Sequence, residues 1–259
     1  MALASAKRAL RDSRTEAAAG ERSEPGGFAA LPVDGEKRAA VRLMFERIAP
    51  RYDVLNRLLT LGLDQRWRRR ALDAVGVGAG DVVVDVATGT GDLAELAAAR
   101  GARVIGVDYT RGMLRGAARR GIDGSFLQAD AETVPLRGGV ASVITCGFSL
   151  RNFVSLPAVL QEMARLLAPG GRLALLEVDV PRSRFVRAVH GFYFTRIVPR
   201  IGALLSDRAA YAYLPRSVSY LPPRDALLQL VRDAGFEAVE HRSLLLGTAQ
   251  LVTARRSRA

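Results

Sequence analysis

The segment that most constrains the fold is a valine-rich run followed by a glycine turn and a helix. Val82 to Val86 is almost continuously β-branched, as expected of a strand buried on both faces. The turn reads Asp85-Val86-Ala87-Thr88-Gly89-Thr90-Gly91, and Asp92 to Arg100 is rich in Ala and Leu. This order of elements suits a nucleoside or anionic ligand, because glycine lets the backbone approach closely and a helix N-terminus adds a positive field.

The alternation of strand and helix continues along the chain. Further strands are expected at Arg103 to Val107, Ser125 to Gln128, Ala141 to Cys146 and Arg172 to Val178. Helices are expected at Thr110 to Arg120, Leu156 to Leu167 and Pro223 to Ala234, with Pro169-Gly170-Gly171 as a turn before the strand from Arg172. Two last strands, near Glu237 to His241 and Gln250 to Ala254, are separated only by a loop. The pattern predicts an α/β, Rossmann-like fold with a seven-stranded, mostly parallel sheet and an antiparallel C-terminal hairpin.

Three segments lie outside this alternation. Residues 1–35 have few large apolar residues and are expected to form a disordered extension before a domain at 36–259. N-terminal helices are expected from Lys37 to Ile48 and from Val54 to Val75, with a break at Leu61-Gly62. Residues 181–220 are rich in Arg and aromatic residues, and we expect an inserted helical cap that lies over the strand ends.

The formal net charge of +12 invites a nucleic-acid interpretation. Only Lys7 and Lys37 are lysines, so the charge is almost entirely Arg, which weakens that interpretation and favours a solvated basic surface. An anionic membrane surface is the next candidate, with Trp67 among its neighbouring arginines as one patch. No apolar run approaches the roughly 18 residues that span a bilayer. Cys146 is the only cysteine, which fits a reducing cytoplasm.

Three aspartates separate two cofactor classes. Asp85 would repel a pyrophosphate but suits loop amides or a ligand ammonium, although it also suits a loop cap. Asp108 ends the next strand, where it can accept hydrogen bonds from ribose hydroxyls, and Asp130-Ala131 follows the third strand, where it can read an adenine edge. Together with the C-terminal hairpin, these positions favour S-adenosylmethionine over a nicotinamide dinucleotide. Thr90, between the two glycines, is the threonine expected to contact the ligand.

Longer motifs resemble those of one family, the ubiquinone/menaquinone biosynthesis C-methyltransferases. The resemblance spans about residues 40–255, and its most specific segments are Arg51-Tyr52-Asp53, Leu150-Arg151-Asn152 and Pro199-Arg200-Ile201-Gly202. It implies methyl transfer from S-adenosylmethionine to a ring carbon of a lipid-tailed, polyprenylated quinol, with demethylmenaquinol to menaquinol as the expected reaction. The expected location is cytoplasmic, with peripheral contact at the inner face of the cell membrane, no nucleic-acid partner, and a homodimer left open.

The resemblance also implies roles for individual residues. Thr90, Asp108, Asp130 and Ala131 carry over as cofactor contacts. The remaining expected cofactor residues are Asp85, Ala87, Thr88, Gly89, Gly91, Tyr109, Met113 and Gly147. Gly147 stands where the family usually has serine, so a backbone contact is possible there and a hydroxyl contact is not. No metal site is expected.

The expected catalytic residues are Arg151 and Asn152. Arg151 would stabilise a quinol phenolate, although it could instead pair with a carboxylate, and Asn152 would orient the quinol oxygen. Tyr52 and Asp53 are expected to close over the cofactor on the substrate side. Tyr193 and Tyr211, in the inserted segment, are expected to line the quinol pocket.

Other functions stay open at this point. Gly147 and the segment Leu246-Gly247-Thr248-Ala249-Gln250 depart from the family pattern, which is compatible with another small hydrophobic acceptor. The charge suggests a nucleic-acid methyltransferase, but the Asn/Asp-Pro-Pro-Tyr motif is missing after the fourth strand. A non-catalytic cofactor-binding protein is the third alternative, and the retained aspartates and Arg151-Asn152 argue against it.

Overall fold

A computed structural model describes residues 34–193, 196 and 217–258 of the chain. These residues form one seven-stranded sheet in the order β3-β2-β1-β4-β5-β7-β6. The strands are β1 Val82–Val86, β2 Arg103–Asp108, β3 Ser125–Gln128, β4 Ala141–Gly147, β5 Leu167–Val178, β6 Phe236–Leu244 and β7 Ala249–Arg256. The first five run parallel, and β7 pairs antiparallel with both β5 and β6. The predicted Rossmann-like sheet with its antiparallel C-terminal pair is therefore confirmed.

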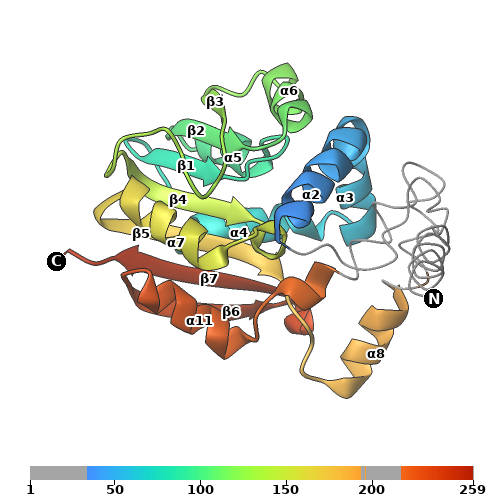
Figure 1. The fold of residues 1–259 in the computed structure, drawn as a ribbon. Coiled ribbons are helices and arrows are strands. Elements are labelled where there is room, and N and C mark those ends of the chain that lie inside the picture. The colour runs from blue at the N-terminus through green and yellow to red at the C-terminus, as the bar shows by residue number, and fades with distance from the viewer. Residues whose placement is uncertain (1–33, 194–195, 197–216, 259) are drawn as a thin grey trace, which may run out of the picture.

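Helices cover both faces of the sheet and its carboxyl edge (Figure 1). They are α2 Asp34–Ile48, α3 Tyr52–Thr60, α4 Leu63–Ala74, α5 Asp92–Ala98, α6 Arg111–Arg119, α7 Leu156–Leu166, α8 Arg184–Phe192 and α11 Arg224–Asp233. Short 3-10 turns are η1 Ala49–Arg51, η2 Leu150–Asn152, η4 Val218–Tyr220 and η5 Leu245–Gly247. The break between α3 and α4 falls at Leu61 and Gly62, as expected, and both residues are left-handed, with φ of 53° and 74°.

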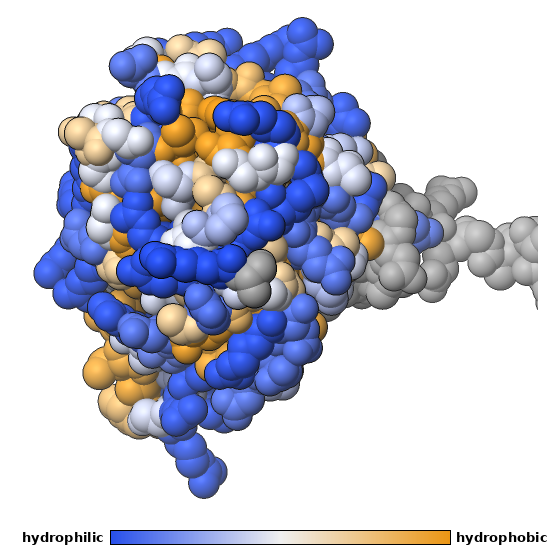
Figure 2. Space-filling view, turned by 90° about the vertical axis from the view of Figure 1, so that its left-hand side faces the viewer, coloured by the Kyte–Doolittle hydropathy of each residue, from blue (hydrophilic) through white to orange (hydrophobic). Residues whose placement is uncertain are grey.

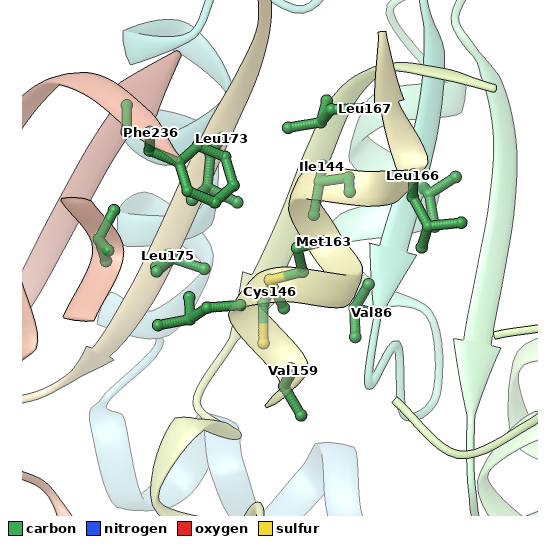
Figure 3. Close-up of a cluster of buried hydrophobic side chains, with 14 of the residues drawn as sticks. Val86, Ile144, Cys146, Val159, Met163, Leu166, Leu167, Leu173, Leu175 and Phe236 are labelled. Atoms are coloured by element: carbon green, nitrogen blue, oxygen red, sulfur yellow. The ribbon is translucent and has the colours of Figure 1, made fainter. Parts of the chain in front are cut away.

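Alternate side chains of the central strands enter two separate apolar layers, because successive residues of a strand point to opposite faces. Val83 of β1 packs with α4 and α5 on one face, whereas Val84 packs with α7 on the other. Neither side chain is accessible to solvent. Figure 3 shows the second layer, where Met163 and Leu166 of α7 lie over Ile144 and Leu173.

The order of the strands in the sheet reverses at β1. Strands β2 and β3 extend the sheet to one side of β1, and β4 and β5 extend it to the other. The helices that follow β1 and β4 diverge at this switch point, which leaves a crevice at the carboxyl ends of the strands, where doubly wound sheets bind ligands. Helices α2 and α3 lie at this edge (Figure 1).

The expected turn at Pro169-Gly170-Gly171 is wrong. Strand β5 begins at Leu167 and includes these residues. Leu167 is fully buried and pairs with Ala141, so the chain already belongs to the sheet before the glycines. The register then shifts, and regular pairing resumes between Val143 and Arg172. Three residues that suggested a turn therefore form an irregularity inside a strand.

The expected surface patch around Trp67 is also wrong. Trp67 and Arg68 are buried, with 8% and 5% of their surface exposed. The indole packs against the Phe148 ring, with 6.2 Å between the ring centroids. Trp67 and Arg68 lie on the inner face of α4, and the adjacent residues Arg66 and Arg69 lie on its solvent-exposed face.

The inserted segment is described only in part. Helix α8 lies beyond the carboxyl ends of the strands, consistent with a cap there (Figure 1). Tyr211 falls outside the described residues. Within the described ranges, no helix is long and apolar enough to cross a membrane. Figure 2 shows the opposite edge, where the parallel strands begin, and its surface is largely hydrophilic.

Met163 tests the core. Replacement by Ala removes a fully buried side chain from α7 and should lower the free energy of unfolding by about 2–5 kcal/mol, through lost burial and a residual cavity. Leu43→Ala, at a helical position that is 60% exposed, should change it by less than about 0.5 kcal/mol. Denaturant titration measures both variants, and equal losses would contradict the assigned core.

Candidate functional site

A cleft with an empty volume of about 1050 Å³ opens at the carboxyl ends of β1, β2 and β4. It collects most of the residues that the sequence singled out. Those that line it are Tyr52, Asp85, Ala87, Thr88, Gly89, Thr90, Asp108, Tyr109, Met113, Asp130, Ala131, Gly147 and Asn152. Asp53, Gly91, Arg151 and Tyr193 do not line it, although they contact residues around it.

The glycine turn has the backbone of a ligand cradle. Ala87, Gly89 and Gly91 have φ of 55°, 58° and 88°. A Cβ at Gly91 would lie 2.5 Å from Ile122 Cδ1, so this glycine allows α5 to pack closely, while nothing lies within 4 Å of the Cβ position at Gly89. The open position at Gly89 leaves space for a ligand beside the backbone.

Asp85 is buried at the end of β1 and joins the turn to β4. Its carboxylate accepts hydrogen bonds from the hydroxyls of Thr88 and Thr145, each at 2.6 Å. Only 1% of Asp85 is exposed, and this burial raises its pKa to about 6, although the two hydroxyls oppose the rise. The carboxyl group therefore holds the turn in place and lines the cleft at the same time.

Asp108 fixes the other side of the turn. Its carboxylate accepts from the backbone amides of Gly89 at 2.8 Å and Thr110 at 2.7 Å. Burial raises the pKa of Asp108, and the two amides counteract this. Each carboxylate oxygen accepts a hydrogen bond from one of these amides and can accept another. The carboxylate can therefore also accept hydrogen bonds from a pair of ribose hydroxyls.

Helix α2 closes the end of the cleft that is lined by the loop after β3. Arg38 pairs with Asp130 and Glu132, each at 3.0 Å. Lys37 is buried on the same helix, and its ammonium donates to the Phe153 carbonyl at 2.7 Å. Burial lowers the pKa of Lys37. The N-terminal helix is thereby tied both to the loop after β3 and to the segment after η2.

Helix α3 closes over the glycine turn. The Thr90 hydroxyl donates to Asp53 at 2.5 Å, and Arg120 of the loop after α6 reaches Asp53 at 3.5 Å. Arg120 also pairs with Asp92 at 2.8 Å, and Arg57 reaches Asp92 at 3.2 Å. Burial opposes ionisation of Asp92, but Arg68, Arg120 and Arg57 together lower its pKa. Asp53 therefore contacts the glycine turn through Thr90.

Arg68 is a site residue that the sequence analysis missed. It lines the cleft and pairs with Asp64 at 2.8 Å and Asp92 at 3.3 Å. Its guanidinium lies 5.1 Å from the Phe148 ring centroid. The four-residue spacing between Asp64 and Arg68 was a visible signal, because such pairs face each other on a helix. Arg38 was also missed, although it lies about one helical turn before Val41, which also lines the cleft.

Arg151 is held by a buried carboxylate, one of the alternatives that the sequence left open. It is paired with Glu177 of β5, which is fully buried. Its Nη1 also donates to the Phe148 carbonyl at 2.8 Å, and its Nε donates to Ser217 at 3.1 Å. The described side-chain hydrogen bonds of Arg151 are thus made by its Nε and Nη1. Its neighbour Asn152 lines the cleft.

The donor set fits S-adenosylmethionine. Asp108 suits ribose hydroxyls, Asp130 and the Ala131 amide suit an adenine edge, and Asp85 and the open backbone at Gly89 suit the amino-acid end. At Gly147, a Cβ would lie 2.9 Å from Leu93 Cδ1, so the leucine methyl occupies the space of a larger residue. This contact explains why glycine is tolerated there and leaves the Gly147 backbone facing the cleft.

Comparisons with known proteins find a matching family. The model of the ubiE/COQ5 methyltransferase family matches residues 33–256. The demethylmenaquinone methyltransferase of Thermus thermophilus is 44% identical over 215 residues, which cover 80% of this chain and 97% of the relative. The ubiquinone/menaquinone biosynthesis C-methyltransferase of Syntrophotalea carbinolica is 41% identical over 222 residues, covering 83% and 94%.

Solved structures share the fold at low identity. A methyltransferase from Aquifex aeolicus that depends on S-adenosylmethionine has a TM-score of 0.53 and 17% identity, covering 73% of this chain and 88% of its own. The [4+2]-cyclase SpnF has a TM-score of 0.64 and 16% identity, covering 90% and 100%. The same fold carries different chemistries, so the acceptor must be argued from the site.

The raised pKa of Asp85 predicts a pH-dependent stability. The folded protein binds this proton more tightly than the unfolded chain, so the contribution is fully present below about pH 4 and is lost as pH rises through about 6. Between pH 4 and 8, the free energy of unfolding of the wild type should fall by about 2.5 kcal/mol relative to Asp85→Asn. Denaturant titrations measure this, with Asp123→Asn at an exposed carboxyl as control. A wild-type-minus-variant difference that is flat with pH would contradict the assignment.

Proposed function

Because the chain belongs to the ubiE/COQ5 methyltransferase family, we propose that it methylates a ring carbon of a polyprenylated quinol, converting demethylmenaquinol to menaquinol. The observation that carries the proposal is the convergence of the three cleft aspartates with the Arg151-Asn152 segment at one sheet edge. The names of the similar relatives support the acceptor class, and the cleft supports the methyl donor.

S-adenosylmethionine supplies an electrophilic methyl group on a sulfonium. We assign its ribose to Asp108, its adenine edge to Asp130 and the Ala131 amide, and its amino-acid end to the backbone around Gly89. Tyr109 and Met113 provide further walls of the cleft. The chain's own contribution at this end is orientation, because a methyl transfer needs donor and acceptor aligned.

The acceptor carbon must be made electron-rich, and ionisation of a quinol hydroxyl does this. Two guanidinium groups, Arg68 and Arg151, lie near the hydroxyl of Tyr52 and oppose the rise that burial causes in its pKa. The same positive field favours a quinolate in the cleft. We assign Nη2 of Arg151 to the quinol oxygen and Asn152 to its orientation. Glu177 acts as a positioning residue that holds Arg151.

Apolar residues complete the acceptor side. Val41, Phe45, Phe153 and Val154 line the cleft and suit a bicyclic ring. Tyr193 donates to the Leu59 carbonyl at 3.0 Å and so ties the residue after α8 to α3. We assign the mouth between these elements to the prenyl tail. Such a substrate resides in the bilayer, so we also propose peripheral contact with the inner face of the cell membrane.

Label transfer tests the acceptor. The protein is incubated with S-adenosylmethionine carrying a labelled methyl group and with reduced membrane lipids from a strain that lacks the enzyme. We expect label in menaquinol, identified by mass. Label in a different lipid would redirect the proposal to another hydrophobic acceptor, the reading that the glycine at 147 favours, and label in added RNA or DNA would overturn it.

Arg151 gives a more specific prediction. Arg151→Lys keeps the charge and loses the forked geometry, so kcat should fall by about 100-fold or more. The Kd for S-adenosylmethionine should change by less than about threefold, because Arg151 does not line the cofactor end. Arg165→Lys, at an exposed pair with Glu162, is the matched control.

A second variant separates chemistry from folding. Arg151→Met alone leaves Glu177 as an unpaired buried carboxylate, which is strongly destabilising. The double variant with Glu177→Gln removes that charge and should fold, yet remain inactive. Turnover near the wild-type level in the folded double variant would overturn the role of Arg151.

A further inference from the structure

The turn between β6 and β7 presents two leucines in an unusual backbone conformation. Leu245 and Leu246 have φ of 38° and 56°, and Gly247 follows with φ of 90°. The leucine side chains point outward: 46% of Leu245 and 77% of Leu246 is exposed. Apolar side chains and left-handed backbone both disfavour this turn in water, where Gly or Asn is the ordinary choice.

This arrangement is held firmly by its surroundings. The Leu245 carbonyl accepts from the amide and the hydroxyl of Thr248, at 3.1 and 3.0 Å. Thr248 in turn accepts from the Asp179 amide at 3.0 Å. A Cβ at Gly247 would lie 3.3 Å from Pro181 Cα, so the turn packs directly on the segment that leads into α8. The backbone that carries the two leucines is thus fixed by hydrogen bonds and by packing.

The neighbouring segment, residues 179–192, adds further exposed apolar side chains and several cationic ones. Val180, Phe185 and Phe192 are 48%, 77% and 61% exposed. Between them stand three exposed arginines, Arg182, Arg184 and Arg187. The one acid of this segment, Asp179, is paired with Arg224 at 2.5 Å. The local charge is therefore strongly positive, and apolar groups project among the cations.

We propose that the β6–β7 turn, with the start of the inserted segment, is a docking surface for an anionic lipid bilayer. Leu245 and Leu246 enter the headgroup region, and Arg182, Arg184 and Arg187 contact the anionic headgroups, since an apolar face flanked by arginines is the pattern of interfacial binding. β5 ends and β7 begins at this edge, where the cleft also opens. This docking rests on the proposed lipid-tailed substrate: the turn and the arginines would hold the cleft against the membrane that contains it.

Tryptophan fluorescence tests insertion directly. The single native tryptophan, Trp67, is buried, so a second one at the turn reports its own environment. Leu246→Trp should shift its emission to the blue on addition of vesicles containing phosphatidylglycerol, and less so with phosphatidylcholine alone. Ala99→Trp is the matched control, because α5 runs back from the glycine turn and places this exposed residue at the opposite edge. Identical responses of the two variants would overturn the proposal.

A double variant separates docking from folding and from catalysis. Leu245→Gly with Leu246→Gly removes both side chains and suits the left-handed backbone, so Tm should stay the same or rise. Vesicle co-sedimentation should weaken about tenfold or more, as expected for two partly inserted leucyl groups lost from an apolar interface. Undiminished co-sedimentation would overturn the proposal.

Activity on a water-soluble quinol with a short tail should be unchanged in the double variant, because the turn lies outside the cleft lining. If the wild type fails to methylate the quinol yet binds vesicles through the turn, the proposed function fails and the docking surface stands. If methylation succeeds and the double variant still binds vesicles fully, the docking surface fails alone.

Discussion

The organisation of this site depends on one buried carboxylate, Asp85, at the end of the central strand. Its two hydrogen bonds, from Thr88 and Thr145, join the glycine turn to β4 and fix where the cleft opens. A lone buried charge would be unfavourable, and the two hydroxyls together with the raised pKa limit that cost. Asp108 then sets the opposite side of the turn through the Gly89 amide.

The N-terminal helices complete the cleft through charge rather than through apolar packing alone. Arg38 reaches the loop after β3, and Asp53 reaches Thr90 in the glycine turn. The end of the cleft that we assign to the cofactor is therefore enclosed by contacts to segments distant in sequence. The proposed acceptor end depends on the pair between Arg151 and Glu177, which holds a guanidinium beside the cleft in a place that water does not easily screen.

Local patterns in the sequence predicted the strands of the sheet well. They could not predict contacts between residues that are far apart in the sequence. Val82–Val86 and Ser125–Gln128 match the expected strands to the residue, and for Val82–Val86 the β-branched run is a local signal. The sequence Pro169-Gly170-Gly171 wrongly predicted a turn, because the pairing of Leu167 with Ala141 places these residues inside a strand. Arg68 was misjudged because its burial depends on Asp92, whose distance in sequence hides the pairing.

The position of the transferred methyl group tests the central claim most directly. The enzyme is given S-adenosylmethionine with a carbon-13 methyl group and reduced demethylmenaquinone, and the product is examined by carbon-13 NMR. The account predicts one new resonance of a methyl group bound to a ring carbon. A methyl resonance on oxygen, or none, would contradict it.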